Sequence, residues 1–163
     1  MKSLKPLPLV AAEEGNIDAL EAMIDGGASI DVKDDKGKTL LYYGVKLKDD
    51  RLLKYLLREG ADINEADEYE ETPVFWAIDN YNPSKLETVV LFGGKVDVKN
   101  KYGSTPLHEA VYKGSRTLVE VLVDNGADLS ALNSDKRTPR KLAKKLKYKG
   151  LKKYLKKKEK EQK

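Results

Sequence analysis

The sequence contains 163 residues, of which 40% are hydrophobic and 36% are charged, enough for one compact domain or one short repeat array with a strongly charged surface. It contains no cysteine, which excludes disulfide bonds, thiolate metal ligands and a cysteine nucleophile, and which is compatible with a reducing compartment. No stretch approaches the roughly 20 apolar residues that a membrane-spanning helix requires, and the net charge of +4 combines a basic C-terminus with an acidic remainder.

The N-terminal segment has two interpretations. The N-terminus from Met1 to Ala12 faintly resembles a secretory signal, but its apolar run is short, and Pro6 and Pro8 interrupt it. A signal peptide needs a clear central apolar region. We expect the stretch to form the first helix of a capping unit over residues 5–31 instead.

Two residue types then recur at a constant step along the chain. They are Thr39, Thr72, Thr105 and Thr138, and Gly27, Gly60, Gly93 and Gly126, and in each set the residue number rises by 33 from one member to the next. Self-similarity at a fixed period of this length indicates a repeat architecture in which each repeat is one supersecondary unit.

The local chemistry of each repeat predicts two helices. Threonine is a favourable N-cap because its hydroxyl accepts a free N–H of the first helical turn. Pro73, Pro106 and Pro139 follow at the first helical position, where a missing N–H costs nothing. A second helix with apolar residues at helical spacing comes next, and Gly60 and Gly126 end it where the chain turns left-handed.

The segments 103–114 and 118–128 carry a resemblance to a known family, because they are close to the ankyrin-repeat consensus. The resemblance covers nearly the whole chain and implies an all-α solenoid of about five helix-turn-helix repeats with projecting β-hairpin fingers. Neighbouring repeats would supply one another's core. The implied ankyrin-repeat domain spans residues 1–157. It consists of an N-terminal cap (5–31), three repeats (32–64, 65–97 and 98–130) and a C-terminal cap (131–157). A disordered lysine-rich tail (158–163) follows the domain.

Three positions depart from the repeat pattern. Glu70 occupies the finger position where the preceding repeat has Gly37, so this finger must either adopt a strained conformation or change its turn. Tyr81 and Lys48 replace the glycine that the family has between the two helices. These departures leave the fold prediction unchanged and suggest that the third unit has a specialised surface.

No group of residues predicts catalysis. His108 is the only histidine, and it matches the histidine of the family's Thr-Pro-Leu-His motif, for which the resemblance implies a structural role; the alternative is a base or a ligand. One histidine without cysteine cannot form the usual zinc site. The acidic run at 65–71 lacks the alternating pattern of a calcium loop, and no phosphate-binding glycine motif is present. We expect no catalytic residue, metal or cofactor.

The resemblance also implies a partner-binding concave surface, made of the finger tips and the exposed side of each first helix. The positions carried over are Asp35, Lys36, Lys38, Tyr43, Lys46, Leu47, Glu68, Tyr69, Glu71, Trp76, Asp79, Asn80, Lys101, Tyr102, Ser104, Tyr112 and Lys113. The caps would add Glu13, Glu14, Asp135, Arg137, Lys144 and Lys145.

Five aromatic residues on this surface are the strongest candidates for contacts, because tyrosine and tryptophan often dominate interface energies. They are Tyr43, Tyr69, Trp76, Tyr102 and Tyr112. The alternative for each is packing against a neighbouring repeat, and we expect at least two to be exposed contacts. The charges of the surface run from acidic to basic along the array, which favours a dipolar partner unless the segregation is accidental.

The C-terminus is strongly basic. Residues 138–163 contain thirteen Lys or Arg and two Glu, a net charge of +11 that leaves 4 − 11 = −7 for the rest of the chain. Leu142, Leu146, Leu151 and Leu155 predict a helical stripe that seals the last repeat, with the lysines on its solvated face. The alternative is attachment to nucleic acid or to an anionic membrane through the lysines.

The sequence therefore predicts a non-catalytic protein–protein interaction module, an adaptor, regulator or effector that binds an unidentified protein as a monomer. The alternative function is electrostatic binding of nucleic acid or anionic membrane through the lysine-rich C-terminus. A consensus-designed binder is disfavoured, because a design would not keep Lys48, Glu70 or Tyr81. We expect a cytoplasmic protein, with a secreted effector as the alternative.

Overall fold

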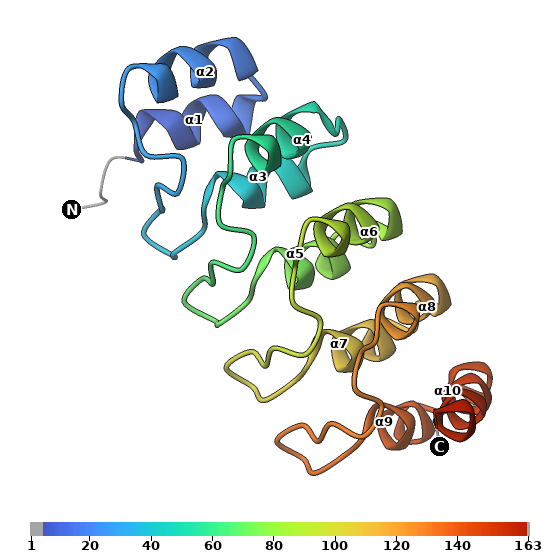
Figure 1. Cartoon of the computed structure of the whole chain (residues 1–163). Coiled ribbons are helices and arrows are strands. Elements are labelled where there is room, and N and C mark those ends of the chain that lie inside the picture. Colours follow the sequence, from blue (N-terminus) through green and yellow to red (C-terminus); the bar gives the residue numbers. More distant parts are fainter. Residues whose placement is uncertain (1–4, 163) are drawn as a thin grey trace.

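The computed structural model describes residues 5–162, and within them the chain consists of helices joined by turns, without a β strand (Figure 1). Antiparallel helix pairs stack along one axis into an elongated solenoid, which confirms the predicted all-α repeat fold. In chain order the helices are α1 (Leu7–Glu14), α2 (Ile17–Asp25), α3 (Leu40–Lys46), α4 (Arg51–Arg58), α5 (Pro73–Asp79), α6 (Pro83–Leu91), α7 (Pro106–Tyr112), α8 (Arg116–Asp124), α9 (Pro139–Lys145) and α10 (Lys149–Glu161).

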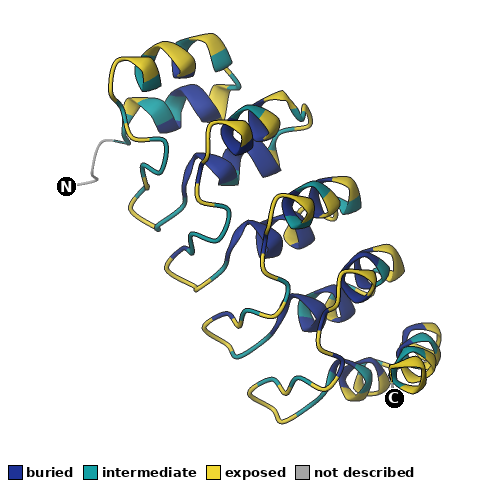
Figure 2. Cartoon of the chain, in the orientation of Figure 1, coloured by how far each residue is buried: buried dark blue, intermediate teal, exposed yellow. Residues whose placement is uncertain are grey.

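The apolar side chains form one continuous core through the stack. The core runs from Leu9 in α1 to Leu155 in α10. In Figure 2 the buried residues lie where helices face one another, and the finger turns are mostly exposed or intermediate. Small residues allow the close approach: a Cβ atom added to Gly44 would lie 2.9 Å from the Leu53 Cα. Each repeat therefore covers the apolar face of its neighbour.

The helices α3, α5, α7 and α9 each begin after a threonine with an extended backbone. The hydroxyls of Thr105 and Thr138 accept hydrogen bonds from backbone N–H groups of the first turn, which confirms the predicted capping at these two positions. The buried hydroxyls of Thr39 and Thr72 have no partner among the described residues. A buried hydroxyl without a partner destabilises the fold, so these two helix starts rely on packing instead.

Between repeats the chain forms finger-like turns that bond to one another. The finger of the third unit (residues 65–97) closes through a hydrogen bond of 3.0 Å from the Asp67 N–H to the Glu71 carbonyl. The Glu68 N–H donates to the Lys36 carbonyl of the previous finger, also at 3.0 Å. The fingers expected as β hairpins are thus hairpin turns, because each makes too few ladder bonds for a strand. Glu70 has a φ of 59°, so the strained left-handed conformation is the observed outcome of the two predicted.

The turn between paired helices differs in the second unit. Tyr81 keeps the left-handed turn with a φ of 51°, whereas no residue in the turn that contains Lys48 has a positive φ. There the ammonium group of Lys85, which is buried in α6, donates hydrogen bonds to the carbonyls of Gly44, at 2.8 Å, and Leu47. This ammonium satisfies carbonyls at the end of α3 that a glycine turn would otherwise satisfy. No pattern in the sequence predicted this contact.

The last helix is longer than the sequence indicated. We expected disorder from Lys158 onward, but α10 continues to Glu161. A salt bridge of 2.7 Å joins Glu159 to Arg140 and holds the additional turn against α9. The final expected tail residue, Lys163, lies outside the described residues.

At the other end, α1 occupies the position predicted for the first helix of the cap. Residues 1–4, which belong to the signal-peptide interpretation, lie outside the described part of the chain. Among the helices that the structure describes, none is long and apolar enough to cross a membrane.

Candidate functional site

The finger turns and the exposed sides of α3, α5, α7 and α9 form one side of the solenoid, which we call the concave face (Figure 1). Hydrogen bonds between successive fingers fix their spacing. The Lys101 N–H donates to the Tyr69 carbonyl at 2.8 Å, and the Ser134 hydroxyl donates to the Tyr102 carbonyl at 2.6 Å. The fingers are therefore a linked, preorganised surface.

Three of the five predicted aromatic contacts are accessible on this face. Tyr69, Tyr102 and Tyr112 are 38%, 60% and 63% exposed, whereas Tyr43 and Trp76 are 5% and 1% exposed. The expectation that Tyr43 and Trp76 offer their rings to a partner is therefore wrong, and the packing alternative holds for both.

Packing within the third unit explains why Trp76 is buried. Its indole N–H donates to the Asp67 carboxylate at 3.3 Å, and the other oxygen of that carboxylate accepts from the finger's backbone. The ring of Tyr42 meets both Tyr43 and Trp76 edge-on, at centroid distances of 5.2 and 5.6 Å. These aromatics therefore brace the finger and hold adjacent repeats together.

The remaining predicted positions fall into two groups by exposure. The exposed ones are Asp35, Lys36, Lys46, Glu68, Asp79, Asn80 and Lys101. The partly buried ones are Lys38, Leu47, Glu71, Ser104 and Lys113. Lys38 has a supporting role, because its ammonium lies 3.8 Å from the centre of the Tyr42 ring.

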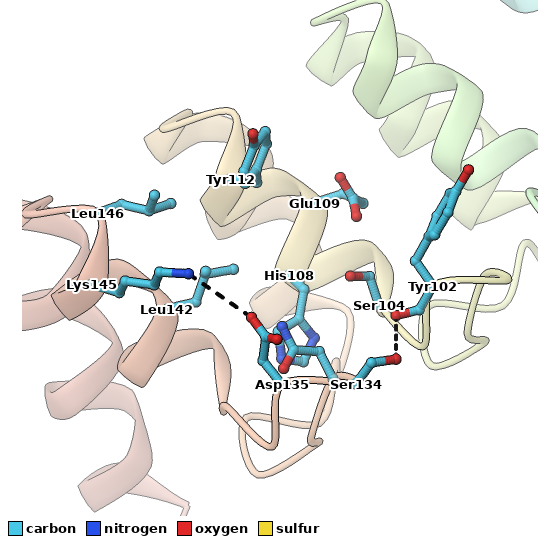
Figure 3. Close-up of a pocket in the computed structure, with 11 residues that line it drawn as sticks. Tyr102, Ser104, His108, Glu109, Tyr112, Ser134, Asp135, Leu142, Lys145 and Leu146 are labelled. Carbon is cyan, nitrogen blue, oxygen red and sulfur yellow. Dashed lines mark hydrogen bonds and ion pairs between the residues drawn. The ribbon is translucent and has the colours of Figure 1, made fainter.

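A hollow of 330 Å³ opens on the concave face between the fourth unit and the C-terminal cap (Figure 3). The fourth unit contributes Tyr102, Ser104, His108, Glu109 and Tyr112, and the cap contributes Asn133, Ser134, Asp135, Leu142, Lys145 and Leu146. Leu142 and Leu146 were expected only in the sealing stripe, and Glu109 was not among the predicted site residues. The side of a helix that faces a gap between repeats has no signal in a 33-residue pattern.

His108 forms part of the floor of this hollow and is held on both ring nitrogens. Nδ1 lies 2.8 Å from the Thr105 hydroxyl, and Nε2 lies 2.8 Å from the Arg137 carbonyl in the next finger. Burial lowers the pKa of His108, which favours the neutral ring. Nδ1 holds the start of α7 within its own repeat, and Nε2 joins this repeat to the next. Both nitrogens are therefore occupied by the fold, which supports the structural interpretation of His108.

Two carboxyl groups of the concave face are half-buried. Burial, followed by the negative charges of Asp79 and Asp67, raises the pKa of Glu71 to about 7. Burial also raises the pKa of Glu109. The nearby Lys113 pairs at 2.9 Å with Asp79, and no lysine or arginine of the described residues forms a salt bridge with Glu71 or Glu109. The centre of the face therefore holds two carboxyls that lack a cation.

The described residues contain no group of three or more His, Asp or Glu side chains arranged to hold a metal ion. The chemistry of the face is thus aromatic, hydrogen-bonding and ionic, which suits contacts with a macromolecule.

The stacked helix pairs and linked fingers define a helical repeat protein with one extended, largely polar face. Comparison with known families matches the description "Ankyrin repeats (3 copies)" over residues 9–91, 42–133 and 74–163, so the chain belongs to the ankyrin-repeat family. Ankyrin repeats are generic protein–protein interaction modules and are typically non-catalytic. No curated protein matches the sequence.

Proposed function

We propose that this chain is a non-catalytic adaptor, regulator or effector that binds a protein partner with its concave face. The observation that carries the proposal is the hollow between α7 and α9, flanked by the exposed rings of Tyr102 and Tyr112. Amphipathic rings beside a preorganised hollow provide the anchoring contacts that dominate many protein interfaces.

The charge of the face favours a partner segment with basic side chains. Glu71 and Glu109 would gain a cation from a lysine or arginine of the partner, and pairing of a half-buried carboxylate is favourable only when the new contact is close. Asn100 lies beside Glu71, with its amide 3.4 Å from the carboxylate, and would orient it. The proposal therefore includes an arginine or lysine of the partner near these two carboxyls.

We also propose that the protein is a monomer in the cytoplasm, and a secreted effector is the alternative. The cysteine-free composition supports a reducing compartment, although it is compatible with others.

Photo-crosslinking tests the binding face directly. A photoreactive amino acid would replace either Tyr112, on the concave face, or Leu91, which is exposed at the end of the outer helix α6. In nuclease-treated lysate of the source organism, the Tyr112 position should capture a discrete protein, and Glu109→Gln should reduce its yield. Capture by the Leu91 position alone would refute the concave-face proposal.

A further inference from the structure

The C-terminal helix α10 carries a row of lysines on one side. Lys149, Lys153, Lys156 and Lys160 follow the spacing i, i+4, i+7 and i+11, so they share one face of a helix. All four are exposed, and none forms a salt bridge within the described residues. We call these four residues the lysine stripe. At about 1.5 Å per residue it is roughly 16 Å long.

Sealing the last repeat does not require this stripe. The opposite side of α10 does the sealing, because Leu151 and Leu155 are buried there. The outer helix at the other end of the solenoid, α2, has a polar face of Asp18, Glu21 and Asp25, so a terminal repeat can be solvated without lysine. Lysines of like charge at i and i+4 destabilise a helix. The uniform charge of the stripe is therefore not explained by folding.

A second hollow continues the basic surface beyond the start of α10. It has a volume of 250 Å³ and is lined by Ala143, Lys144, Lys147, Tyr148, Lys149 and Lys152. Tyr148 provides no side-chain cap for α10. The Lys149 N–H donates to the Lys147 carbonyl, so the next N–H groups of the first turn are left without a cap at a hollow lined by four lysines. Helix N-termini and ammonium groups together favour a phosphate.

We propose that the lysine stripe and this second hollow form a binding surface for the phosphate backbone of a nucleic acid. A duplex presents one negative charge roughly every 1.7 Å along its axis, which suits a linear row of cations. Lysines without arginine forks supply positioning contacts and no base readout, so binding is independent of sequence. A bilayer is a poorer match, because Leu151 and Leu155 are buried and cannot insert among lipids.

The dependence of binding on salt tests the proposal quantitatively. Fluorescence anisotropy with a labelled 20-base-pair duplex would be measured between about 50 and about 200 mM KCl, the range over which counterion release is readily resolved. With about six phosphate contacts, the log–log slope of the association constant against salt is near −5, so affinity falls roughly 10³-fold over this range. Replacing the four stripe lysines by glutamine should bring the slope to about −2 and weaken binding by about 100-fold or more at the lowest salt, by the same counterion release.

A matched variant removes the same charge elsewhere. Lys48, Lys54, Arg58 and Lys95 are also exposed, and their replacement by glutamine should leave the slope nearly unchanged. The stripe variant should retain its helical circular dichroism and melt at the same or a higher temperature, because glutamine is a good helix former and the repulsion between like charges is removed. Equal slopes for the two variants would overturn the proposal. So would retention of the protein by mixed phosphatidylcholine and phosphatidylserine vesicles without binding to the duplex, which would assign the surface to membranes.

Discussion

Individual side chains on the concave face have two separable roles. Trp76 and Tyr43 have the residue types expected of binding contacts, yet both are buried and hold neighbouring repeats together. Tyr102 and Tyr112 are exposed on the same face, at other positions of the 33-residue period. Residue type does not separate the two pairs, because all four side chains are aromatic. Burial depends on the neighbours, since Tyr42 packs edge-on against both Tyr43 and Trp76.

Replacing Trp76 by alanine tests its supporting role. The substitution leaves a large cavity and removes the indole hydrogen bond to Asp67, so it should lower the free energy of unfolding by about 3–5 kcal/mol. Tyr112→Ala, at an exposed position, should change it by less than about 0.5 kcal/mol. Urea denaturation followed by circular dichroism measures both. A small effect at Trp76 would show that the ring is not part of the core.

Glu71 should make stability depend on pH. Its pKa is about 7 in the folded protein and 4.5 ordinarily, so the folded state holds the proton more tightly. The stability associated with this proton is complete below pH 4.5 and is lost as the pH rises to 7. Because the group is half-exposed and screened, Glu71→Gln should stabilise the protein by only about 1–2 kcal/mol at pH 8. It should have almost no effect at pH 4. Equal effects at both pH values, in urea denaturation, would contradict the assignment.

At the scale of elements, the finger of the third unit retains its shape despite the loss of glycine. The finger tips at Gly37 and Gly103 have φ values of 76° and 68°, and Glu70 and the equivalent Lys136 adopt a similar conformation at 59° and 54°. The hydrogen bonds that Asp67 accepts from Tyr69 and Glu71 hold this turn. A side chain in the left-handed region is strained, so the finger stores a small local penalty.

The strain predicts opposite effects for exchanges at two equivalent positions. Glu70→Gly should stabilise the protein by about 0.5–1 kcal/mol, because glycine tolerates positive φ. Gly37→Ala should destabilise it by at least about 1 kcal/mol, since the added Cβ would also lie 3.1 Å from the Asp67 Cα. Thermal melts of both variants provide the measurement. Destabilisation by Glu70→Gly would mean that the glutamate side chain makes a contact that outweighs the strain.

The sequence predicted the elements better than their contacts. The 33-residue period predicts the helix pairs and the finger positions, because both depend on local backbone chemistry, and it left the left-handed conformation of Glu70 as one of two outcomes. The burial of Lys85 could not be predicted, since its ammonium meets carbonyls about 40 residues away in the preceding repeat. The hollow beside Tyr112 likewise arises from the gap between two repeats, which neither repeat encodes alone.

At the scale of the whole molecule, the two proposed surfaces differ in chemistry and in position. The concave face is rich in tyrosine and carboxyl groups, and the basic surface lies on the outer helix at the C-terminal end (Figure 1). Residues 138–163 carry a net charge of +11, and the remainder of the chain sums to −7. Salt should therefore weaken nucleic-acid binding far more than protein binding. The two proposed surfaces meet at α9, because Lys145 lines the concave hollow and Lys144 lines the basic one.

Isothermal titration calorimetry with the crosslinked partner tests whether the concave face binds a protein. The partner would first be identified and purified. Wild type would be compared with Tyr102→Ala/Tyr112→Ala and with the control Leu91→Ala/Phe92→Ala, which removes two exposed apolar side chains from the outer helix end. We expect the tyrosine variant to lose affinity by about 30-fold or more, as for interface anchors, and the control to keep its affinity. Unchanged binding by the tyrosine variant, with loss in the control, would contradict binding at the concave face.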